Sequence, residues 1–389
     1  MSAAHQIDDQ TLTLLRNGEE YFPRLVAAIN DAARSVYLET YIFAGDATGH
    51  LIAGALQRAA QRGAVVRLLL DGFGSSALPP AMLDDLRAAG VEVLWFRPEI
   101  ARFKLRRYRL RRLHRKLAVV DGQIAFVGGI NIEDDVPGGP IAAPRLDYAV
   151  EVRGDTAERI HQAVRRLWLL VQWTNFRRQR EREQLKPAPA DDPQQKIAFL
   201  LRDNLRHRRD IEQAYLEAIA GARREIVIAN AYFLPGRVFR HALLQAARRG
   251  VRVILLLQGK VEYRLQHYAM LALYSELLGA GVEIHEYRAS YLHAKVAVVD
   301  GCWATVGSSN IDPFSLWLGR EANLVVRDAG FAGTLRASLS HEIALRASLV
   351  THIAWRRRGL AARLLMRASY GIVRLLTGLI GYARGSDDV

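Results

Sequence analysis

The chain has 389 residues, of which 50% are hydrophobic, and it carries a formal net charge of +14. This length allows two domains of ordinary size or one large duplicated unit. The charge predicts an anionic partner, either nucleic acid or an anionic bilayer. The single cysteine, Cys302, excludes an intramolecular disulfide framework and fits a reducing compartment. The sequence shows no secretory signal pattern and no apolar run of about 18 residues, so we expect no membrane-spanning helix.

Helix-like and strand-like patterns alternate along the first half of the chain. Apolar residues at helical spacing are separated by short apolar runs that end in turn residues. In order, we expect a helix from residue 21, a strand at 36–43, a helix at 50–64, a strand at 65–75, a helix at 82–90, a strand at 91–96, a basic segment and a β-hairpin.

The same order recurs in the second half. The segment GVEVLWFR at 90–97 matches GVEIHEYR at 281–288, and LLLDG matches LLLQG. We therefore predict a duplicated α/β fold: two homologous α/β/α sandwich halves with mixed, largely parallel sheets, because strands alternate with helices. The second set comprises a helix at 211–225, a strand at 226–233, a helix at 239–250, a strand at 251–259, a helical stretch at 263–281, a strand at 282–288 and a second hairpin.

Composition indicates where these halves begin and end. A polar, proline-bearing stretch separates them and is typical of a linker. The predicted division is an N-terminal half at 1–175, a linker at 176–196, a C-terminal half at 197–350 and a basic amphipathic helix at 351–389.

One short pattern occurs twice, once in each half. Each copy has a histidine, a lysine two residues on, an aspartate seven on, a glycine fourteen on and an asparagine seventeen on. Each copy predicts a β-hairpin, because an alternating apolar strand meets an Asp-Gly turn and a second apolar run. The histidine and the lysine share one pleat face of their strand. The copies are His114, Lys116, Asp121, Gly128 and Asn131, and His293, Lys295, Asp300, Gly307 and Asn310.

These residue types suit a phosphodiester. Lysine and asparagine can hold non-bridging phosphate oxygens, and a histidine can attack phosphorus or protonate a leaving alkoxide. One copy supplies half of such a site, whereas two copies place a histidine on each side of one phosphorus, as in-line displacement requires. No cysteine cluster, phosphate-binding glycine loop or His-x3-His pair accompanies them, so the sequence predicts neither a metal nor a cofactor.

The doubled pattern resembles the phospholipase D superfamily over most of the chain. The resemblance implies that the motifs meet across a pseudo-two-fold axis, where one histidine forms a phosphohistidine and the other moves the proton of the alcohol. It assigns His114 as nucleophile and His293 as general acid/base, although the near-symmetric halves leave their order open. The family's phosphate-binding positions are matched by Lys116, Lys295, Asn131 and Asn310.

The resemblance also implies an acidic residue beyond each motif. A histidine that attacks through one ring nitrogen needs an acceptor for the N–H of the other, and Asp147 and Glu321 match these positions. Asp121 and Asp300 complete the catalytic motifs, although an Asp-Gly turn explains them without a catalytic role. At the strand ends we expect further pocket-lining side chains, namely Glu39, Tyr41, Asp71, Asn230, Tyr232 and Gln258.

Within the superfamily, the segments YIFAGDATG, LLLDGFGS and ANAYFLPG look most like bacterial cardiolipin synthases. That likeness implies transfer of a phosphatidyl group from one phosphatidylglycerol to another, with release of glycerol. The chain departs from members with two N-terminal membrane spans and resembles the shorter, peripheral type. The alternatives are phospholipid hydrolysis, a metal-independent nuclease and a non-catalytic binder of membranes or nucleic acid; two intact motifs argue against the last.

The C-terminal segment favours a membrane partner. Between residues 355 and 384, arginines spaced by seven, four and seven lie on one helical stripe, with leucines on the other faces. This pattern is typical of an interfacial helix on an anionic bilayer; the alternative is a helix docked on the protein's own core. A second basic segment, 102–116, could hold lipid headgroups or nucleic-acid phosphates. We expect an anionic phospholipid rather than nucleic acid, at the cytoplasmic face of a bacterial inner membrane.

Overall fold

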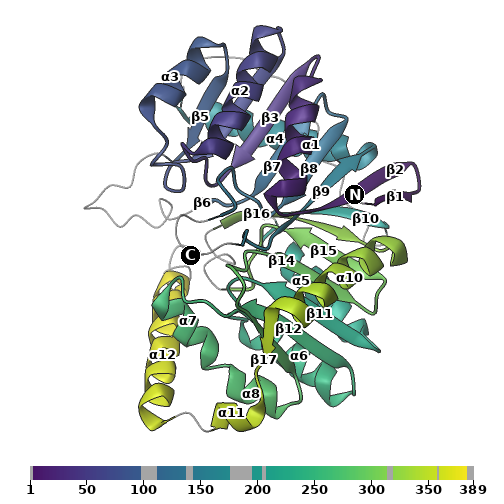
Figure 1. The fold of residues 1–389 in the computed structure, drawn as a ribbon, viewed down its shortest axis with the longest axis vertical. Coiled ribbons are helices and arrows are strands. Elements are labelled where there is room, and N and C mark those ends of the chain that lie inside the picture. The colour runs from purple at the N-terminus through teal and green to yellow at the C-terminus, as the bar shows by residue number, and fades with distance from the viewer. Residues whose placement is uncertain are drawn as a thin grey trace, which may run out of the picture.

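The computed structural model describes residues 3–97, 112–136, 143–175, 195–203, 207–312, 319–356 and 359–382. Within these ranges the strands form two main sheets, one in the upper and one in the lower part of the molecule (Figure 1). The first sheet has the order β1 (Ala4–Ile7), β2 (Gln10–Arg16), β9 (Tyr148–Arg153), β8 (Ile124–Gly128), β7 (Lys116–Val120), β3 (Ser35–Thr40), β4 (Val65–Asp71) and β5 (Glu92–Phe96). The second has the order β10 (Ile197–Arg202), β16 (Gly319–Val326), β15 (Trp303–Gly307), β14 (Lys295–Val299), β11 (Glu225–Asn230), β12 (Arg252–Gln258), β13 (Glu283–Tyr287) and β17 (Ala347–Leu349).

The two sheets repeat one topology. The path β2-β9-β8-β7-β3-β4-β5 in the first sheet corresponds to β10-β16-β15-β14-β11-β12-β13 in the second, and β1 and β17 are additions at the edges. One strand crosses between the halves, because β6 (Arg112–Leu113) pairs with β16. The predicted duplicated α/β fold is confirmed.

The prediction of largely parallel sheets is wrong. Among the described strands, β3, β4 and β5 run parallel, as do β11, β12 and β13. The motif strands and their neighbours pair antiparallel. Parallel pairing needs a crossover helix, which follows β3, β4, β11 and β12, whereas a hairpin turn brings the next strand back antiparallel.

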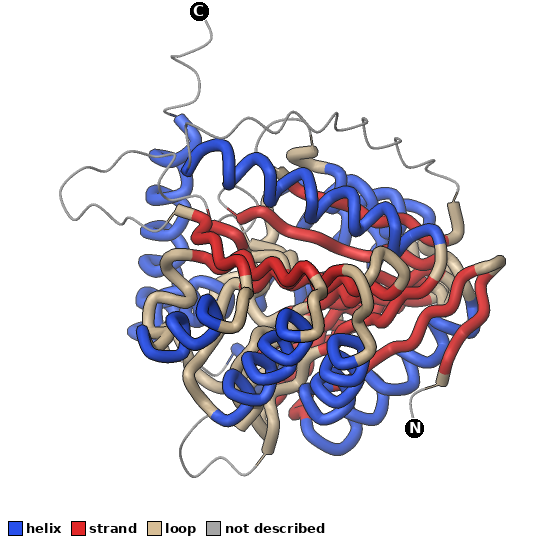
Figure 2. Tube along the Cα trace, turned by 90° about the horizontal axis from the view of Figure 1, so that it is seen from above, coloured by secondary structure: helices blue, strands red, loops and turns tan. Residues whose placement is uncertain are grey.

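Helices cover both faces of each sheet, as the view from above shows (Figure 2). The outer face of the first sheet carries α1 (Asn17–Asn30), α2 (Ala47–Gln61) and α3 (Pro80–Ala88), and its inner face carries α4 (Asp155–Asn175). The outer face of the second carries α5 (Asp210–Gly221), α6 (Arg237–Arg248), α7 (Arg264–Leu271) and α8 (Tyr274–Gly279), and its inner face carries α10 (Ala329–Arg346).

Strand residues alternate between an outer core and a shared inner core. Leu117 and Val119 face the inner core with α4, whereas Ala118 and Val120 face the core under α1 and α2. The inner core contains residues of both sheets and of both inner helices. Because apolar side chains lie on both strand faces, the strands appear in the sequence as nearly continuous apolar runs.

Both predicted hairpins are present, and their turns explain the Asp-Gly pairs. Asp121 and Gly122 have φ values of 54° and 71°, and Asp300 and Gly301 have values of 51° and 67°. Two successive residues with positive φ form the type I′ turn, whose twist matches that of the flanking strands. Aspartate tolerates the left-handed region better than most side chains, and glycine adopts it freely.

The last described helices are α11 (His352–Arg356) and α12 (Leu360–Tyr382). Met366 and Val373 of α12 are buried in the core beneath α7, and helices α7 and α12 lie side by side in Figure 1. The outward face of α12 is apolar as well, because Leu360, Leu364 and Leu375 are 76%, 65% and 64% exposed. In the described part of the chain we find no helix that is long and apolar enough to cross a bilayer.

The predicted domain limits stay predictions. Residues 176–194 of the expected linker lie outside the described residues, as do 102–111 of the basic segment. The same holds for 357–358 and 383–389 within the expected C-terminal helix.

Candidate active site

The two motif histidines come from different sheets and meet where the halves join. His114 precedes β7 and His293 precedes β14. The N–H of His114 donates to the carbonyl of Arg320 (3.0 Å), and the N–H of His293 donates to the carbonyl of Leu146 (2.8 Å). Each carbonyl belongs to the residue just before an acidic side chain that the family resemblance singled out. Backbone contacts between the halves therefore fix both histidines.

A buried polar side chain supports the residue before each histidine. Asp71, at the end of β4, accepts the N–H of Leu113 (2.7 Å), and Gln258, at the end of β12, accepts the N–H of Leu292 (3.0 Å). Both side chains are buried. Sequence reasoning expected Asp71 and Gln258 to line the pocket, but they lie behind its wall and position the histidine segments.

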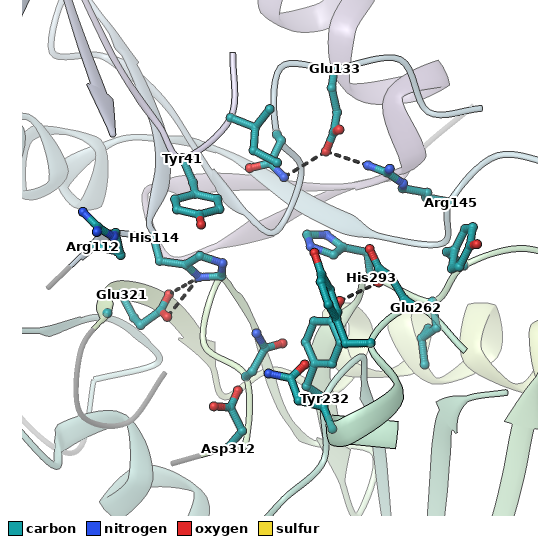
Figure 3. A pocket seen from close by; sticks show the side chains of 18 residues that line it. Tyr41, Arg112, His114, Glu133, Arg145, Tyr232, Glu262, His293, Asp312 and Glu321 are labelled. Carbon is teal, nitrogen blue, oxygen red and sulfur yellow. Dashed lines mark hydrogen bonds and ion pairs between the residues drawn. The ribbon is translucent and has the colours of Figure 1, made fainter. Parts of the chain in front are cut away.

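Each histidine ring is held by a carboxylate of the opposite half. Nδ1 of His114 lies 3.0 Å from Glu321 Oε1 and 3.1 Å from Oε2, and Nδ1 of His293 lies 2.6 Å from Asp147 Oδ2 (Figure 3). With Nδ1–H donated to a carboxylate, Nε2 of each ring is the nitrogen left for chemistry. The resemblance identified both acids, but nothing in the sequence indicated that they exchange partners between the halves.

The histidines open into one cavity of about 450 Å³. Both halves contribute to its wall, and the view in Figure 3 places His114 with Arg112 at one end and His293 with Arg145 and Glu262 at the other. The lining comprises Tyr41, Ile42, Arg112, His114, Asn131, Glu133, Arg145, Tyr232, Glu262, Tyr263, Gln266, Tyr291, Leu292, His293, Asn310, Asp312, Gly319 and Glu321.

The motif lysines are buried against the histidine segments. Nζ of Lys116 donates to the carbonyl of His114 (2.7 Å), and Nζ of Lys295 donates to the carbonyl of His293. Burial, reinforced by the charge of Lys295, lowers the pKa of Lys116 to about 7. Burial lowers the pKa of Lys295 too, although the charge of Asp147 opposes it. Two buried ammonium groups that repel each other form a site that an anion would stabilise.

The motif asparagines face the cavity with unused hydrogen-bonding capacity. The buried Oδ1 atoms of Asn131 and Asn310 have no hydrogen-bond partner among the described residues. Nδ2 of Asn131 donates to Glu133 (3.0 Å). An unpaired buried polar atom costs free energy, so paired instances in one cavity are typical of a site that binds a polar ligand.

The two histidine–carboxylate pairs differ electrostatically. Burial raises the pKa of Asp147 to about 6, against the opposing charge of Lys295. Burial acts on Glu321 in the same direction, but the neighbouring His114 and Lys116 and the Ser308 hydroxyl outweigh it and lower its pKa. Burial and the charges of Lys295 and Lys116 hold the pKa of His293 well below its usual value.

Asp121 and Asp300 lie at the far ends of the motif strands and do not line the cavity. Asp121 accepts the backbone N–H groups of Ala33, Arg34 and Ser35 at 2.7–2.9 Å. Asp300 accepts those of residues 223–225 at 2.8–2.9 Å. The structure thus separates these aspartates from the other motif side chains and gives each a role in bracing a loop.

Sequence reasoning included Arg112 in the basic segment 102–116 but missed other charged residues in the cavity wall, namely Glu133, Arg145, Glu262 and Asp312. Arg145 pairs with Glu133 (2.6 Å), and Glu262 accepts the hydroxyl of Tyr232 (2.5 Å). Only the repeat offered a signal, because Glu133 follows Asn131 by two residues as Asp312 follows Asn310. In the described residues, no group of three or more His, Cys, Asp or Glu side chains could hold a metal ion.

The chain is similar to known proteins over most of its length. A family model described as "Cardiolipin synthase, PLD-like domain" matches residues 25–136 and 215–343. Cardiolipin synthase B of Escherichia coli (strain K12) is 41% identical over 343 residues, covering 86% of this chain and 80% of that protein. A cardiolipin synthase of Geobacillus kaustophilus (strain HTA426) is 33% identical over 80% of this chain and 61% of its own.

A solved structure shares the fold at low sequence identity. A phosphatidylserine synthase from Haemophilus influenzae Rd KW20 superposes with a TM-score of 0.71 at 14% identity, covering 97% of this chain and 96% of that one. The family model covers both halves, and the relatives span most of the chain. The chain therefore belongs to the cardiolipin synthase family of phospholipase D-like proteins.

Proposed function

We propose that the protein is a phospholipase D-type phosphatidyltransferase that makes cardiolipin from two molecules of phosphatidylglycerol and releases glycerol. The observation that carries the proposal is the single cavity in which His114 and His293 meet, each held at Nδ1 by a carboxylate of the opposite half. The relatives supply the substrate class, since cardiolipin synthase B of Escherichia coli is 41% identical over 86% of this chain.

The reaction runs in two displacements at one phosphorus. In the first, Nε2 of His114 attacks the phosphorus of phosphatidylglycerol, the bond from phosphorus to the glycerol oxygen breaks, and His293 gives a proton to that oxygen. In the second, His293 takes the proton from a terminal hydroxyl of the acceptor phosphatidylglycerol. The acceptor oxygen then bonds to phosphorus, the P–N bond breaks, and His114 returns to its starting state.

The lysines and asparagines hold the phosphate during both steps. Lys116 and Lys295 are buried behind the histidine segments and are not part of the cavity lining, whereas Asn131 and Asn310 line the cavity. The lysine ammonium groups and the asparagine Nδ2 groups would donate to the two non-bridging oxygens and stabilise the charge that develops in the transition state.

Substrate binding also prepares His293 to act as an acid. The charges of the two lysines contribute to its low pKa. A bound phosphodiester adds a negative charge beside both lysines and offsets their effect on the ring. The pKa of His293 therefore rises when the donor lipid binds, which favours protonation of the leaving glycerol.

The lipid substrate places the protein at a membrane surface, and α12 supports peripheral attachment there. Met366 and Val373 fix one face of this helix to the protein, and its outward face exposes leucines beside Arg367. Leucines with basic residues on the free side of a docked helix suit an anionic bilayer. We place this attachment at the cytoplasmic face of a bacterial inner membrane.

A metal-free assay with phosphatidylglycerol in mixed micelles tests the function. The wild-type protein is expected to form cardiolipin and glycerol in equal amounts. His114→Ala and His293→Ala are each expected to lose activity by at least about a thousandfold, as removal of a nucleophile or its proton partner does. His241→Ala, at an exposed position on α6, is the matched control and keeps full activity.

The products separate this proposal from its alternatives. Phosphatidic acid as the main product would make the enzyme a phospholipase D that uses water. Cleavage of single-stranded DNA without lipid turnover would make it a nuclease. Mass spectrometry of the protein tests the covalent step: a phosphatidyl adduct on His114 is expected to accumulate in His293→Ala, whereas an adduct on His293 would reverse the roles.

A further inference from the structure

The cavity wall is less symmetric than the motifs that face it. Arg145 precedes Asp147 by two residues, and the residue that precedes Glu321 by two is Gly319. Arg145 and Gly319 both line the cavity. The end of the cavity near His293 therefore carries a guanidinium group for which the repeat supplies no counterpart.

A second difference lies in the loops that follow β4 and β12. Ser75 comes four residues after Asp71, and its hydroxyl is engaged with the backbone of Tyr41 (2.9 Å) and Phe43 (3.0 Å). Glu262 comes four residues after Gln258 and lines the cavity. At this position the side chain of the first half binds the backbone of its own half, whereas the side chain of the second half presents a carboxylate to the cavity.

Glu262 belongs to a polar cluster at the cavity rim. The hydroxyl of Tyr232 donates to Glu262 Oε2 (2.5 Å). Gln266, four residues further on in α7, lines the same wall, and its buried Oε1 has no hydrogen-bond partner among the described residues. An unsatisfied amide oxygen beside a carboxylate and a phenol provides acceptors for the hydroxyl groups of a ligand.

The positive charge of Arg145 indicates which kind of headgroup this cluster can bind. Its ion pair with Glu133 (2.6 Å) uses one of its guanidinium nitrogens, and an arginine has five N–H donors. The cavity wall contains Arg145, Glu133, Glu262 and Tyr263, and Figure 3 places Arg145 and Glu262 at the end near His293. A cationic headgroup such as ethanolamine would meet the repulsion of Arg145, whereas a neutral polyol that carries a phosphate would not.

We propose that Glu262, Tyr232 and Gln266 form an alcohol subsite that binds the glycerol hydroxyl groups of the leaving and the incoming headgroup. In the same subsite Arg145 faces the phosphate of the acceptor lipid. The inference rests on the phosphatidyl transfer proposed above and names the side of the phosphorus from which the alcohol leaves and enters. Glu262, Tyr232 and Gln266 act as specificity residues, and their place beside His293 makes this histidine the one that handles the alcohol proton.

Competition between acceptor alcohols tests the subsite directly. Wild-type protein and variants would receive phosphatidylglycerol with equal concentrations of glycerol and 1-propanol, and the two phosphatidyl alcohols would be counted by isotope-labelled mass spectrometry. Both alcohols compete for the same covalent intermediate, so the product ratio reports recognition of the extra hydroxyl groups alone. Glu262→Gln is expected to lower the preference for glycerol about fivefold or more, and Tyr232→Phe by a smaller factor, as loss of hydrogen bonds to a charged group does.

Glu217→Gln, at an exposed position on α5, is the matched carboxylate control and leaves the ratio unchanged. An unchanged ratio in both Glu262→Gln and Tyr232→Phe would overturn the alcohol subsite while leaving cardiolipin synthesis intact. In the same competition with ethanolamine in place of 1-propanol, a wild-type preference for ethanolamine over glycerol would overturn it too, because it would show an ammonium site. Wild-type protein that transfers no phosphatidyl group to any alcohol would instead overturn the proposed function.

Discussion

The two halves hold their histidines with different sets of side chains. In the second half Ser308 donates to Glu321 (2.6 Å), the acid that binds His114. In the first half the position of Ser308 is taken by Gly129, where a Cβ would collide with the carboxylate of Asp147. The longer acid is thus combined with a serine, and the shorter acid with a glycine that leaves room for it.

A second contrast lies beside the motif strands. Arg115, next to His114, forms a buried ion pair with Glu39, in which Arg115 Nη2 donates to Glu39 Oε1 (2.8 Å). The corresponding residues of the second half are Ala294 and Asn230, which are also buried. The duplication thus keeps histidine and asparagine in the cavity wall and a buried lysine behind each histidine segment, while the supporting residues change as matched sets. The repeated motif residues are therefore compatible with different neighbouring side chains, as long as each set of neighbours is complete.

The largest effect is expected from the orienting acids. Glu321→Gln and Asp147→Asn replace the acceptor of a histidine N–H with an amide that can also donate, so the ring loses its preferred tautomer and orientation. We expect cardiolipin synthesis to fall about a hundredfold or more in each variant, with the fold intact by circular dichroism. Because the contacts cross between the halves, Glu321→Gln is expected to impair the chemistry of His114 and Asp147→Asn that of His293.

Adduct formation separates these two outcomes. In a background of His293→Ala, Glu321→Gln should slow the appearance of the covalent adduct, whereas Asp147→Asn should leave it little changed. Glu92→Gln, far from the cavity at the edge of the first sheet, serves as the control. Equal slowing by both acids would contradict the separate assignment of each carboxylate to one histidine.

Stability tests whether the supporting residues act as sets. Arg115→Ala leaves the carboxylate of Glu39 buried without its partner, which is expected to lower the free energy of unfolding by about 3–5 kcal/mol. The double variant Glu39→Asn with Arg115→Ala copies the second half and should recover most of this loss. Urea unfolding of the two single variants and the double variant measures the coupling. Additive losses would show that the pair does not act as a unit.

Both motif lysines are buried, and pH tests their burial. The pKa of Lys116 falls from 10.5 in the unfolded chain to about 7 in the folded protein. Below pH 7 both states carry the charge, and the folded state bears the full cost of burying it. Between pH 7 and 10.5 the folded state releases the proton first, so this cost declines as pH rises.

Lys116→Met removes that titration. The variant is expected to unfold at higher urea concentration than wild type at pH 6, and its advantage should shrink by about 1.4 kcal/mol for each pH unit above 7. The activity of wild type should fall as pH rises through 7, because Lys116 then loses the positive charge that binds the phosphate. A stability difference that does not change between pH 6 and 9 would contradict the low pKa of Lys116.

Much of the fold could be predicted because the signals are local and doubled. Alternating apolar residues and the Asp-Gly pairs fix the hairpins, and the repeat fixes the number of halves. The sheet direction was mispredicted because helix–strand alternation dominates the early part of each half, whereas the motif hairpins and the later strands add antiparallel pairs. The pattern indicated the helices and strands from residue 21 to 96 and from 211 to 288, but the predicted order did not include antiparallel strands outside these segments, such as β2 and β10.

The site was predictable where a residue repeats and unpredictable where it does not. His114 and His293 stand at the same position in both copies, so they could be named without a structure. Arg145 and Glu262 have Gly319 and Ser75 at the corresponding places, so no repeat signal marks them. The exchange of acids between the halves depends on tertiary contacts, such as the backbone bond from His293 to Leu146. Such contacts cannot be inferred from the spacing of residues in the sequence.

The smallest effect is expected from the aspartates that complete the motifs. Asp121 and Asp300 each accept three backbone N–H groups, and these bonds outweigh burial and lower the pKa of both carboxyls. Asp121→Asn and Asp300→Asn keep the tolerance for positive φ but lose the charged acceptor, so each should lower the free energy of unfolding by about 1–2 kcal/mol. The loss should be present at pH 7 and disappear as the wild-type carboxyl is protonated in acid, because a lowered pKa stabilises only the ionised form.

Specific activity of both aspartate variants should stay within about twofold of wild type. Neither side chain reaches the cavity, and their hydrogen bonds stabilise a loop rather than the catalytic residues. A loss of activity on the scale of the histidine variants, measured under conditions where both proteins are fully folded, would return these aspartates to the catalytic set in which the motif groups them.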